Sequence, residues 1–143
     1  MPPSDATPAV LPPLPQPDAL TTFFWDGVAQ HKLLILCCQT CGHLVHYPRP
    51  LCDRCQGRDL TPTEVSGRAT ISSYTVVEQA FHPYFVDKLP YVLAVVELEE
   101  EAGVRLTTNI VDCTEDRLHI DLPVVVDFRE VAPGFTLPMF RPA

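Results

Sequence analysis

The amino-acid sequence predicts a mainly β protein with a short N-terminal helix, a cysteine-rich metal module and a small closed barrel. Five of the six cysteines fall within one stretch, "CCQTCGHLVHYPRPLCDRC". Sixteen of the 143 residues are prolines, which is well above the ordinary usage of roughly 5% and leaves little room for long helices. From Gly67 onward, short runs rich in Val, Ile, Thr and Tyr alternate with Gly, Pro and acidic turns, a pattern typical of closely spaced strands.

The 143 residues suffice for one domain or two very small ones. No run of 18 apolar residues is present, so we expect no membrane span, and the N-terminus lacks the basic and apolar regions of a signal peptide. Clustered C-x2-C pairs indicate a metal site in a reducing cytosol, and hence a cytoplasmic protein. We expect four segments: a Pro-rich extended tail (1–20), a helix with a lead strand (21–36), a zinc ribbon (37–62) and the barrel (63–143).

The first twenty residues contain seven prolines and almost no charge. Each proline fixes φ and removes a hydrogen-bond donor, so neither a helix nor a sheet ladder is expected there. The segment is either a disordered tail or an extended arm in polyproline II form that lies on a partner. The sequence leaves both interpretations open.

A short amphipathic helix is expected from about Thr22 to Gln30, with Thr21 or Thr22 as the cap. Phe23, Phe24 and Val28 fall near one face of it. Trp25, the single tryptophan, either packs on the body of the protein or is offered to a partner.

The strands of the barrel are expected in four runs, "ATISSYTVVEQ", "YVLAVVELEE", "VRLTTNIV" and "LPVVVDFREV". An earlier apolar run, "LLILCC", predicts a strand that leads into the first cysteine pair. One short helix is expected in "CTEDRLHI", and the three glutamates of "EEEAG" are expected to form a solvated hairpin turn. Four or five strands spaced so closely indicate a small closed barrel.

The metal module consists of Cys38-x2-Cys41 and Cys52-x2-Cys55, separated by ten residues. A C-x2-C pair folds as a tight knuckle that directs two thiolates at one point, and two such knuckles make a tetrahedral four-sulfur site that suits zinc. Gly42 follows the first pair, where a knuckle often needs a positive φ. Because all four positions are thiolates and none is open, we expect structural zinc rather than catalytic zinc.

Cys37 is excluded from this ligand set because its spacing to Cys41 makes a poorer knuckle and because adjacent side chains of an extended chain point in opposite directions. Iron in the same four-sulfur cage is the redox alternative. His43 and His46 could replace a cysteine but are not needed. Cys113 is expected to be a buried small apolar residue. No catalytic residue is predicted.

The acidic charge of the predicted barrel argues against binding of nucleic acid by this protein. Residues 64–131 carry thirteen acidic side chains against five basic ones, and a barrel with this balance would repel a phosphate backbone. A small basic patch lies in the ribbon, where it can meet a phosphorylated ligand or an acidic protein surface. A nucleic-acid-binding protein remains a further alternative, and it predicts steeply salt-dependent retention on heparin.

Several motifs resemble one family, the zinc-ribbon OB-fold proteins catalogued as domain of unknown function thirty-five. They are the F-W helix, the C-x2-C-G knuckle, the P-R-x-x-C-x-x-C return, the S-G opening of the first strand and the P-Y-x-x-x-x-V-E-L second strand. The resemblance covers about residues 20–143. The family carries glycine near the turn in "HIDLPV", where this chain has Asp121.

The resemblance implies an N-terminal helix, a rubredoxin-like zinc ribbon and a C-terminal OB-fold. It also implies a non-catalytic accessory subunit of a thiolase-like aldolase that acts on an acyl-CoA, such as a steroid side-chain CoA thioester cleaved by a retro-aldol step. The alternative is an acyl-CoA-binding subunit of a hot-dog-fold enoyl-CoA hydratase or a thiolase. Either role makes the chain part of a hetero-oligomer in which the reacting groups belong to the partner.

A long loop, "AFHPYFVDKLPY", is the segment in which we expect contact with a partner or an acyl chain. Long loops in compact domains tend to be functional or disordered, and this one is too aromatic for disorder. The alternative is that its aromatic residues cap the barrel end. The candidate contact residues, together with Trp25, are Phe81, Tyr84, Phe85 and Tyr91.

The ligand assignment makes a direct prediction about zinc content. Cys37→Ser is expected to retain a full equivalent of zinc, whereas Cys38→Ser is expected to lose it, because only Cys38 belongs to a C-x2-C knuckle. The zinc content of the purified variants measures this, and the reverse order would contradict the assignment.

Overall fold

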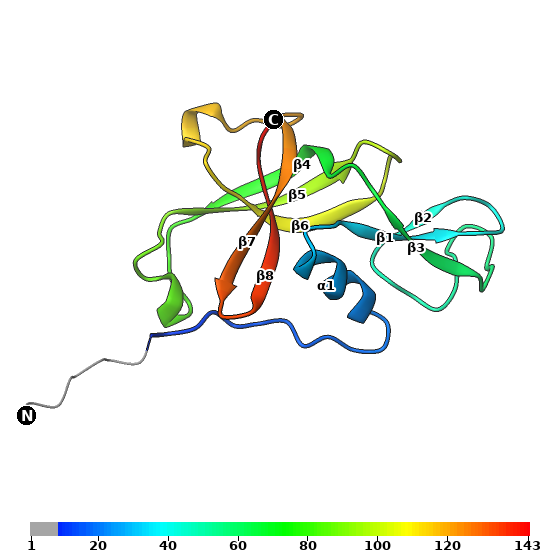
Figure 1. Cartoon of the computed structure of the whole chain (residues 1–143). Coiled ribbons are helices and arrows are strands. Elements are labelled where there is room, and N and C mark those ends of the chain that lie inside the picture. The colour runs from blue at the N-terminus through cyan, green and yellow to red at the C-terminus, as the bar shows by residue number, and fades with distance from the viewer. Residues whose placement is uncertain (1–8) are drawn as a thin grey trace, which may run out of the picture.

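The computed structural model describes residues 9–143 and confirms a mainly β protein with one short α-helix (Figure 1). A three-stranded ribbon sheet lies at one end and a five-stranded closed barrel forms the body. The elements are α1 (Thr22–Ala29), β1 (Leu34–Cys38), β2 (Leu44–Val45), β3 (Leu60–Glu64), β4 (Arg68–Val77), β5 (Tyr91–Leu98), β6 (Arg105–Ile110), β7 (Pro123–Ala132) and β8 (Phe135–Pro142), with 3-10 turns η1 (Pro83–Phe85) and η2 (Glu115–Arg117).

The described part of the Pro-rich segment has no helix or strand, as its prolines predict. It runs beneath the barrel and α1 before the chain enters the helix (Figure 1). Pro12 is buried, so this part of the segment lies against the protein's own body. Residues 1–8 of the predicted tail lie outside the described residues.

Helix α1 forms where the sequence predicts it, and its apolar side packs on β1. Phe24 and Val28 are buried. Gly27 is required at the contact, because a Cβ there would lie 2.8 Å from the side chain of Leu34. The cap differs from the expectation: Thr21 makes no side-chain cap bond, and Asp18 accepts hydrogen bonds from the backbone N–H groups of Leu20 and Thr21 instead.

The barrel closes in the order β4-β5-β6-β8-β7, with β7 paired back to β4. The four predicted runs supply β4, β5, β6 and β7. The fifth strand is β8, which is formed by the C-terminal segment "GFTLPMFRPA" that sequence analysis did not assign to a strand. It pairs with β7 along most of its length and meets β6 in the single parallel pair, Ile110 with Phe140.

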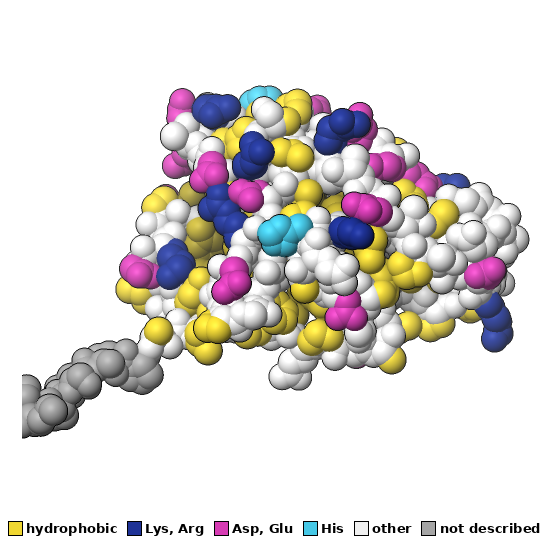
Figure 2. Space-filling model, viewed as in Figure 1, with side chains coloured by type: hydrophobic (Ala, Val, Ile, Leu, Met, Phe, Trp, Pro, Cys, Tyr) yellow, Lys and Arg dark blue, Asp and Glu magenta, His cyan; other side chains and the backbone are white. Residues whose placement is uncertain are grey.

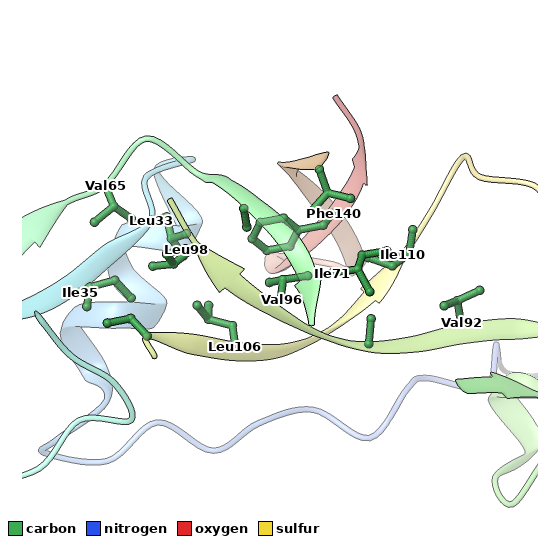
Figure 3. Packing of buried hydrophobic residues seen from close by; sticks show 14 of the residues in the cluster. Leu33, Ile35, Val65, Ile71, Val92, Val96, Leu98, Leu106, Ile110 and Phe140 are labelled. Atoms are coloured by element: carbon green, nitrogen blue, oxygen red, sulfur yellow. The ribbon is translucent and has the colours of Figure 1, made fainter. Parts of the chain in front are cut away.

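One continuous hydrophobic core joins the barrel to α1 and β1. Phe140 is fully buried among Ile71 and Val96 in the barrel, and the cluster continues through Leu33 and Ile35 (Figure 3). The ribbon has only a small cluster of its own, which consists of Leu36, Cys38, Val45 and Cys52. The helix and lead strand therefore share the core of the barrel, whereas the ribbon has little apolar burial to hold it.

Two positions near the barrel ends show why particular turn residues are needed. Asp121, where the resemblance implies glycine, has φ 67°, a left-handed conformation that Asp tolerates better than most side chains do. Gly67 has φ 77°, and a Cβ there would lie 2.3 Å from Val126 Cγ1. The S-G opening of β4 is thus both a backbone and a packing requirement.

We predict that Gly67→Ala lowers the free energy of unfolding by at least about 3 kcal/mol, because the new methyl group collides with Val126 in addition to straining the backbone. Gly134→Ala is the matched control, because φ there is 74° but no atom lies within 4 Å of the new Cβ. It should cost about 1–2 kcal/mol from backbone strain alone. Urea unfolding of both variants measures the difference, and equal losses would contradict the packing argument.

Candidate metal centre

The sulfur atoms of Cys38, Cys41, Cys52 and Cys55 converge at the end of the ribbon, all within 4.8 Å of one another. The Cys38–Cys55 pair is 3.6 Å apart and the Cys41–Cys52 pair is 3.7 Å apart. Tetrahedral zinc with Zn–S bonds of about 2.3 Å separates its sulfurs by about 3.8 Å. The four side chains therefore fit a zinc ion with no position left open for water or substrate.

The two knuckles have the same backbone design. In the first, the N–H of Cys38 donates to His43 O and the N–H of Gly42 donates to Cys38 O. In the second, Cys52 donates to the carbonyl five residues later, and Gln56 donates back to Cys52 O. This repeat explains why two C-x2-C pairs fold locally and direct four sulfurs inward.

A residue in the left-handed conformation follows the last cysteine of each knuckle. Gly42 has φ 76°, as predicted, but the equivalent residue of the second knuckle is Gln56, with φ 61°. Gly57 has a different function: a Cβ there would lie 3.2 Å from the sulfurs of both Cys38 and Cys55 and 2.9 Å from Thr40 Oγ1. The glycine thus allows the chain to pass close to the sulfur cage.

The electrostatics of the site favour a cation. The N–H of Cys41 is the main reason that the pKa of Cys38 falls to about 6. The N–H of His43 acts in the same direction on Cys41, but desolvation and the sulfurs of Cys55 and Cys52 outweigh it and raise the pKa of Cys41 to about 12. Four crowded sulfurs cannot all be thiolates unless a positive ion lies between them.

The remaining cysteines lie apart from the sulfur cage. The Cys37 thiol faces the carbonyl oxygens of Cys38 and Gly42, at 3.9 Å and 3.7 Å. Cys113 is half-buried, with its thiol 3.5 Å from Thr114 O, rather than fully buried as expected. Neither reaches the group of four sulfurs.

A cluster around Glu101 joins the ribbon to the barrel, and sequence analysis missed it. The Glu101 carboxylate accepts hydrogen bonds from the backbone N–H of Leu44 at 2.8 Å and from Arg54 at 2.7 Å, and it lies 2.5 Å from His43 Nδ1. Desolvation raises the pKa of Glu101, but these donors outweigh it and hold the pKa below its ordinary value. His43 is thus a partner of a carboxylate, and its other ring nitrogen faces Asp53.

The turn "EEEAG" forms between β5 and β6 as expected, and Glu99 and Glu100 are exposed, but Glu101 departs from the expected solvation. Glu99 pairs with Arg68 at 2.6 Å, and Glu100 accepts the backbone N–H of Ser66 at 2.7 Å. The Glu101 side chain is only 20% exposed. No sequence signal marks this cluster, because Glu101 and His43 are 58 residues apart.

A pocket of about 220 Å³ lies beside the ribbon, where α1, the segment 46–48, β6 and β8 meet; we call it the junction pocket. Its lining comprises Thr21, Phe24, Trp25, His46, Tyr47, Pro48, Leu106, Thr107, Thr108, Asn109, Leu137, Pro138 and Met139. Trp25 reaches across to the β7–β8 hairpin, with its ring 5.6 Å from that of Phe135. Trp25 therefore packs on the body of the protein and also forms one wall of the pocket.

His46 forms a neutral part of this wall. Its ring is 5.7 Å from the ring of Phe24, and its buried Nδ1 has no hydrogen-bond partner among the described residues. Burial lowers the pKa of His46 from 6.5 to about 4, because the protein offers the charged ring no compensating partner.

The aromatic loop between β4 and β5 lies at the opposite end of the barrel from the ribbon (Figure 1). Tyr84, Phe85 and Tyr91 pack on one another, with ring centroids 5.0 Å apart in each successive pair. Phe81 is 85% exposed and Val86 is 66% exposed. The structure thus places the predicted contact residues of this loop in a packed aromatic group, except for Phe81, which is exposed together with Val86, a residue that sequence analysis did not single out.

Hydrophobic side chains gather along the lower edge of the face in Figure 2, where the N-terminal segment, the aromatic loop and α1 run, whereas most charged side chains lie above them. Within residues 9–143, no helix has the length and apolar character needed to cross a membrane.

Comparison with known proteins agrees with this architecture. Residues 25–61 match the family model for the ChsH2 rubredoxin-like zinc ribbon domain, and residues 62–129 match the one for the ChsH2 C-terminal OB-fold domain. A DUF35 domain-containing scaffold protein of Methanocaldococcus jannaschii is 31% identical over 116 residues, which cover 80% of each chain. The chain belongs to the DUF35 family.

Two further proteins to which this DUF35 protein is similar are described as an aldolase and as a hydratase subunit. A solved structure described as the "Ltp2-ChsH2(DUF35) aldolase" matches with a TM-score of 0.81 and 39% identity, covering 90% of this chain and 98% of that one. A "probable enoyl-CoA hydratase alpha subunit" of Thermomonospora curvata is 39% identical over 140 residues. This chain spans only 43% of the length of that protein.

A DUF35 protein of Sulfolobus solfataricus, at 16% identity and a TM-score of 0.59, shares the fold. The rubredoxin-like zinc ribbon, the OB-fold and structural zinc, first inferred from the resemblance and the cysteine spacing, are thus confirmed for this DUF35 protein by the family models and by the four converging sulfurs.

We predict that His46 makes stability depend on pH. The unfolded chain takes up a proton near pH 6.5, but the folded chain does so only near pH 4, so this contribution is intact above pH 6.5 and is lost as the pH falls toward 4. The full loss is about 3 kcal/mol, at about 1.4 kcal/mol per pH unit. Urea unfolding between pH 7.5 and 5 measures it.

The matched variant His46→Phe keeps an aromatic ring without a titrating nitrogen. Its free energy of unfolding should decline less steeply over the same pH range. Because loss of zinc in acid affects both proteins, the difference between them reports on His46. Identical slopes for the two proteins would show that His46 does not carry this dependence.

Proposed function

We propose that this DUF35 protein is a non-catalytic, zinc-containing accessory subunit that binds and supports a thiolase-like aldolase acting on an acyl-CoA. The observation that carries the proposal is the likeness to the Ltp2-ChsH2(DUF35) aldolase, which extends over 90% of the chain. A retro-aldol cleavage of a steroid side-chain CoA thioester is the reaction that we assign to the complex.

The geometry supports a role without chemistry of its own. The ribbon ends in a cage of four sulfurs, which suits structural zinc, because a catalytic zinc keeps one position for water or substrate. The cage lies at the far end of the ribbon from the barrel core, and it orders a module that has only four buried residues of its own. In this proposal the zinc shapes a docking surface, and the reacting groups belong to the partner.

The aromatic loop is the contact surface that we assign first. Phe81 and Val86 expose apolar side chains that nothing in the described residues covers. Exposed aromatic and aliphatic side chains of this size are typical of the buried centres of protein interfaces. Tyr84, Phe85 and Tyr91 pack on one another in the same loop.

A second candidate function is an acyl-CoA-binding subunit of an enoyl-CoA hydratase. The hydratase alpha subunits of Thermomonospora curvata and Mycobacterium tuberculosis favour it, at 39% and 33% identity. This chain covers 43% and 37% of those proteins, so more than half of each has no counterpart here. Copurification with a hydratase subunit rather than with a thiolase-like protein would favour this alternative.

We predict that the chain binds the Ltp2 subunit of the aldolase, and that the complex, but not the isolated chain, cleaves a carbon–carbon bond in the side chain of the CoA thioester. Phe81→Ser combined with Val86→Ser should weaken binding at least tenfold, because the exposed pair would no longer be buried at the interface. Isothermal titration calorimetry measures the affinity. Retro-aldol cleavage of the CoA thioester substrate by the isolated chain would contradict the accessory role.

Ile120→Ser is the matched control, because Ile120 is 51% exposed and lies in a different loop. It should bind as the unaltered chain does. A Tyr84→Ala, Phe85→Ala double variant is less decisive, because both residues are half-buried and their loss also changes the packing of the loop.

A further inference from the structure

We propose that the junction pocket receives one apolar side chain of the partner protein, and that a carboxylate next to that side chain pairs with Arg49. This inference rests on the proposed accessory function and deepens it, because it names a second contact surface and the chemistry of what binds there. The surface lies between the ribbon and the barrel, away from the aromatic loop.

The size of the pocket favours a single side chain. Its volume of about 220 Å³ exceeds the roughly 150 Å³ of an engineered cavity that binds benzene. It is smaller than the roughly 300–1,000 Å³ typical of pockets that enclose a drug-sized ligand. One aromatic or branched aliphatic side chain fits this space, whereas a whole acyl-CoA does not.

The buried Nδ1 of His46 has no hydrogen-bond partner among the described residues, but other polar groups of the lining do. The Tyr47 hydroxyl donates to Thr107 Oγ1 at 3.0 Å, the Thr108 hydroxyl donates to Pro138 O at 2.8 Å, and Asn109 Nδ2 donates to Val92 O at 3.0 Å. The occupant therefore need not bring hydrogen-bonding groups into the pocket. An apolar group that displaces water from Trp25, Leu137 and their neighbours gains the hydrophobic contribution without breaking these hydrogen bonds.

The surroundings of the pocket favour a protein surface over a small molecule. Tyr47, which forms part of the lining, is 55% exposed, and Leu20 and Leu51, close to lining residues in the chain, are 42% and 39% exposed. A ligand confined to the pocket would leave these side chains in water. A protein that inserts one side chain would cover them as well, which is the arrangement of an interface anchor surrounded by a water-excluding rim.

The charge beside the pocket indicates which kind of partner side chain lies next to the inserted apolar one. Arg49 follows the pocket-lining Pro48, and its Nε donates to Tyr47 O at 3.4 Å. Arg49 is exposed and makes no ion pair with any of residues 9–143, unlike Arg54, which Glu101 holds. A chain with a net charge of -8 thus presents an unpaired cation beside an apolar pocket, and an Asp or Glu of the partner is its complement.

Two variants test the two halves of the proposal in the full chain, titrated with the Ltp2 subunit of the aldolase. Thr107→Trp fills the pocket from β6, and Arg49→Glu reverses the charge at its rim. Each should weaken binding at least tenfold. The Arg49→Glu effect should shrink as salt is raised, because an exposed ion pair is screened, whereas the Thr107→Trp effect should persist.

Each variant has a matched control. Thr107→Val removes the hydroxyl that Tyr47 uses but leaves the pocket open, and Arg58→Glu reverses another exposed, unpaired arginine of the ribbon. Both controls should bind within about threefold of the unaltered chain, since neither blocks the pocket nor changes its rim. Zinc content and circular dichroism report whether each variant is folded.

The outcomes separate this inference from the proposed function. If the unaltered chain binds Ltp2 and Thr107→Trp binds equally well while folded, the pocket proposal is overturned and the accessory function stands. Equal losses for Arg49→Glu and Arg58→Glu would overturn the specific role of Arg49. Absence of binding by the unaltered chain would overturn the proposed function, and this inference with it.

Discussion

The convergence of four cysteine sulfurs is the constraint on which the ribbon depends. The ribbon's own cluster buries only Leu36, Val45 and two of the cysteines, too little apolar surface to hold a module of this size. Without a cation the crowded sulfurs cannot all ionise, whereas structural zinc in small fingers contributes on the order of 10–16 kcal/mol. The ion thus replaces a hydrophobic core, and every surface that the ribbon presents requires it.

The ribbon contacts the barrel at two places, one apolar and one polar. The apolar attachment is the continuous cluster that runs from Phe140 through Leu33 and Ile35 to α1. The polar attachment is Glu101, which holds His43, Leu44 and Arg54 at the tip of the β5–β6 hairpin. Together they define the orientation of the segment 46–48, which forms a wall of the junction pocket. A surface built from three parts of the chain is well suited to an accessory subunit, because its shape exists only when all of them are in place.

Much of the fold could be predicted because its signals are local. The C-x2-C spacing selects one ligand set, and the alternation of β-branched residues and turns places β4 to β7. The same local reasoning also shows its limits. Gly42 takes the expected positive φ, but in the second knuckle Gln56 takes it, and Gly57 is needed for close approach to the sulfurs instead. The second glycine has its role because of a contact with Cys38, nineteen residues earlier, which no spacing rule describes.

The sequence by itself determined the class of the protein, the sulfur cage and the strands that carry alternating patterns, because each depends on residues close together in the chain. Only the tertiary structure decided that the C-terminal segment becomes β8 and that Trp25 forms a pocket wall. It also decided that the Glu101 side chain binds the ribbon instead of facing solvent. These features require residues far apart in the chain to meet, Glu101 and His43 across 58 positions. Their energies come from burial and charge pairing that exist only after the barrel has closed.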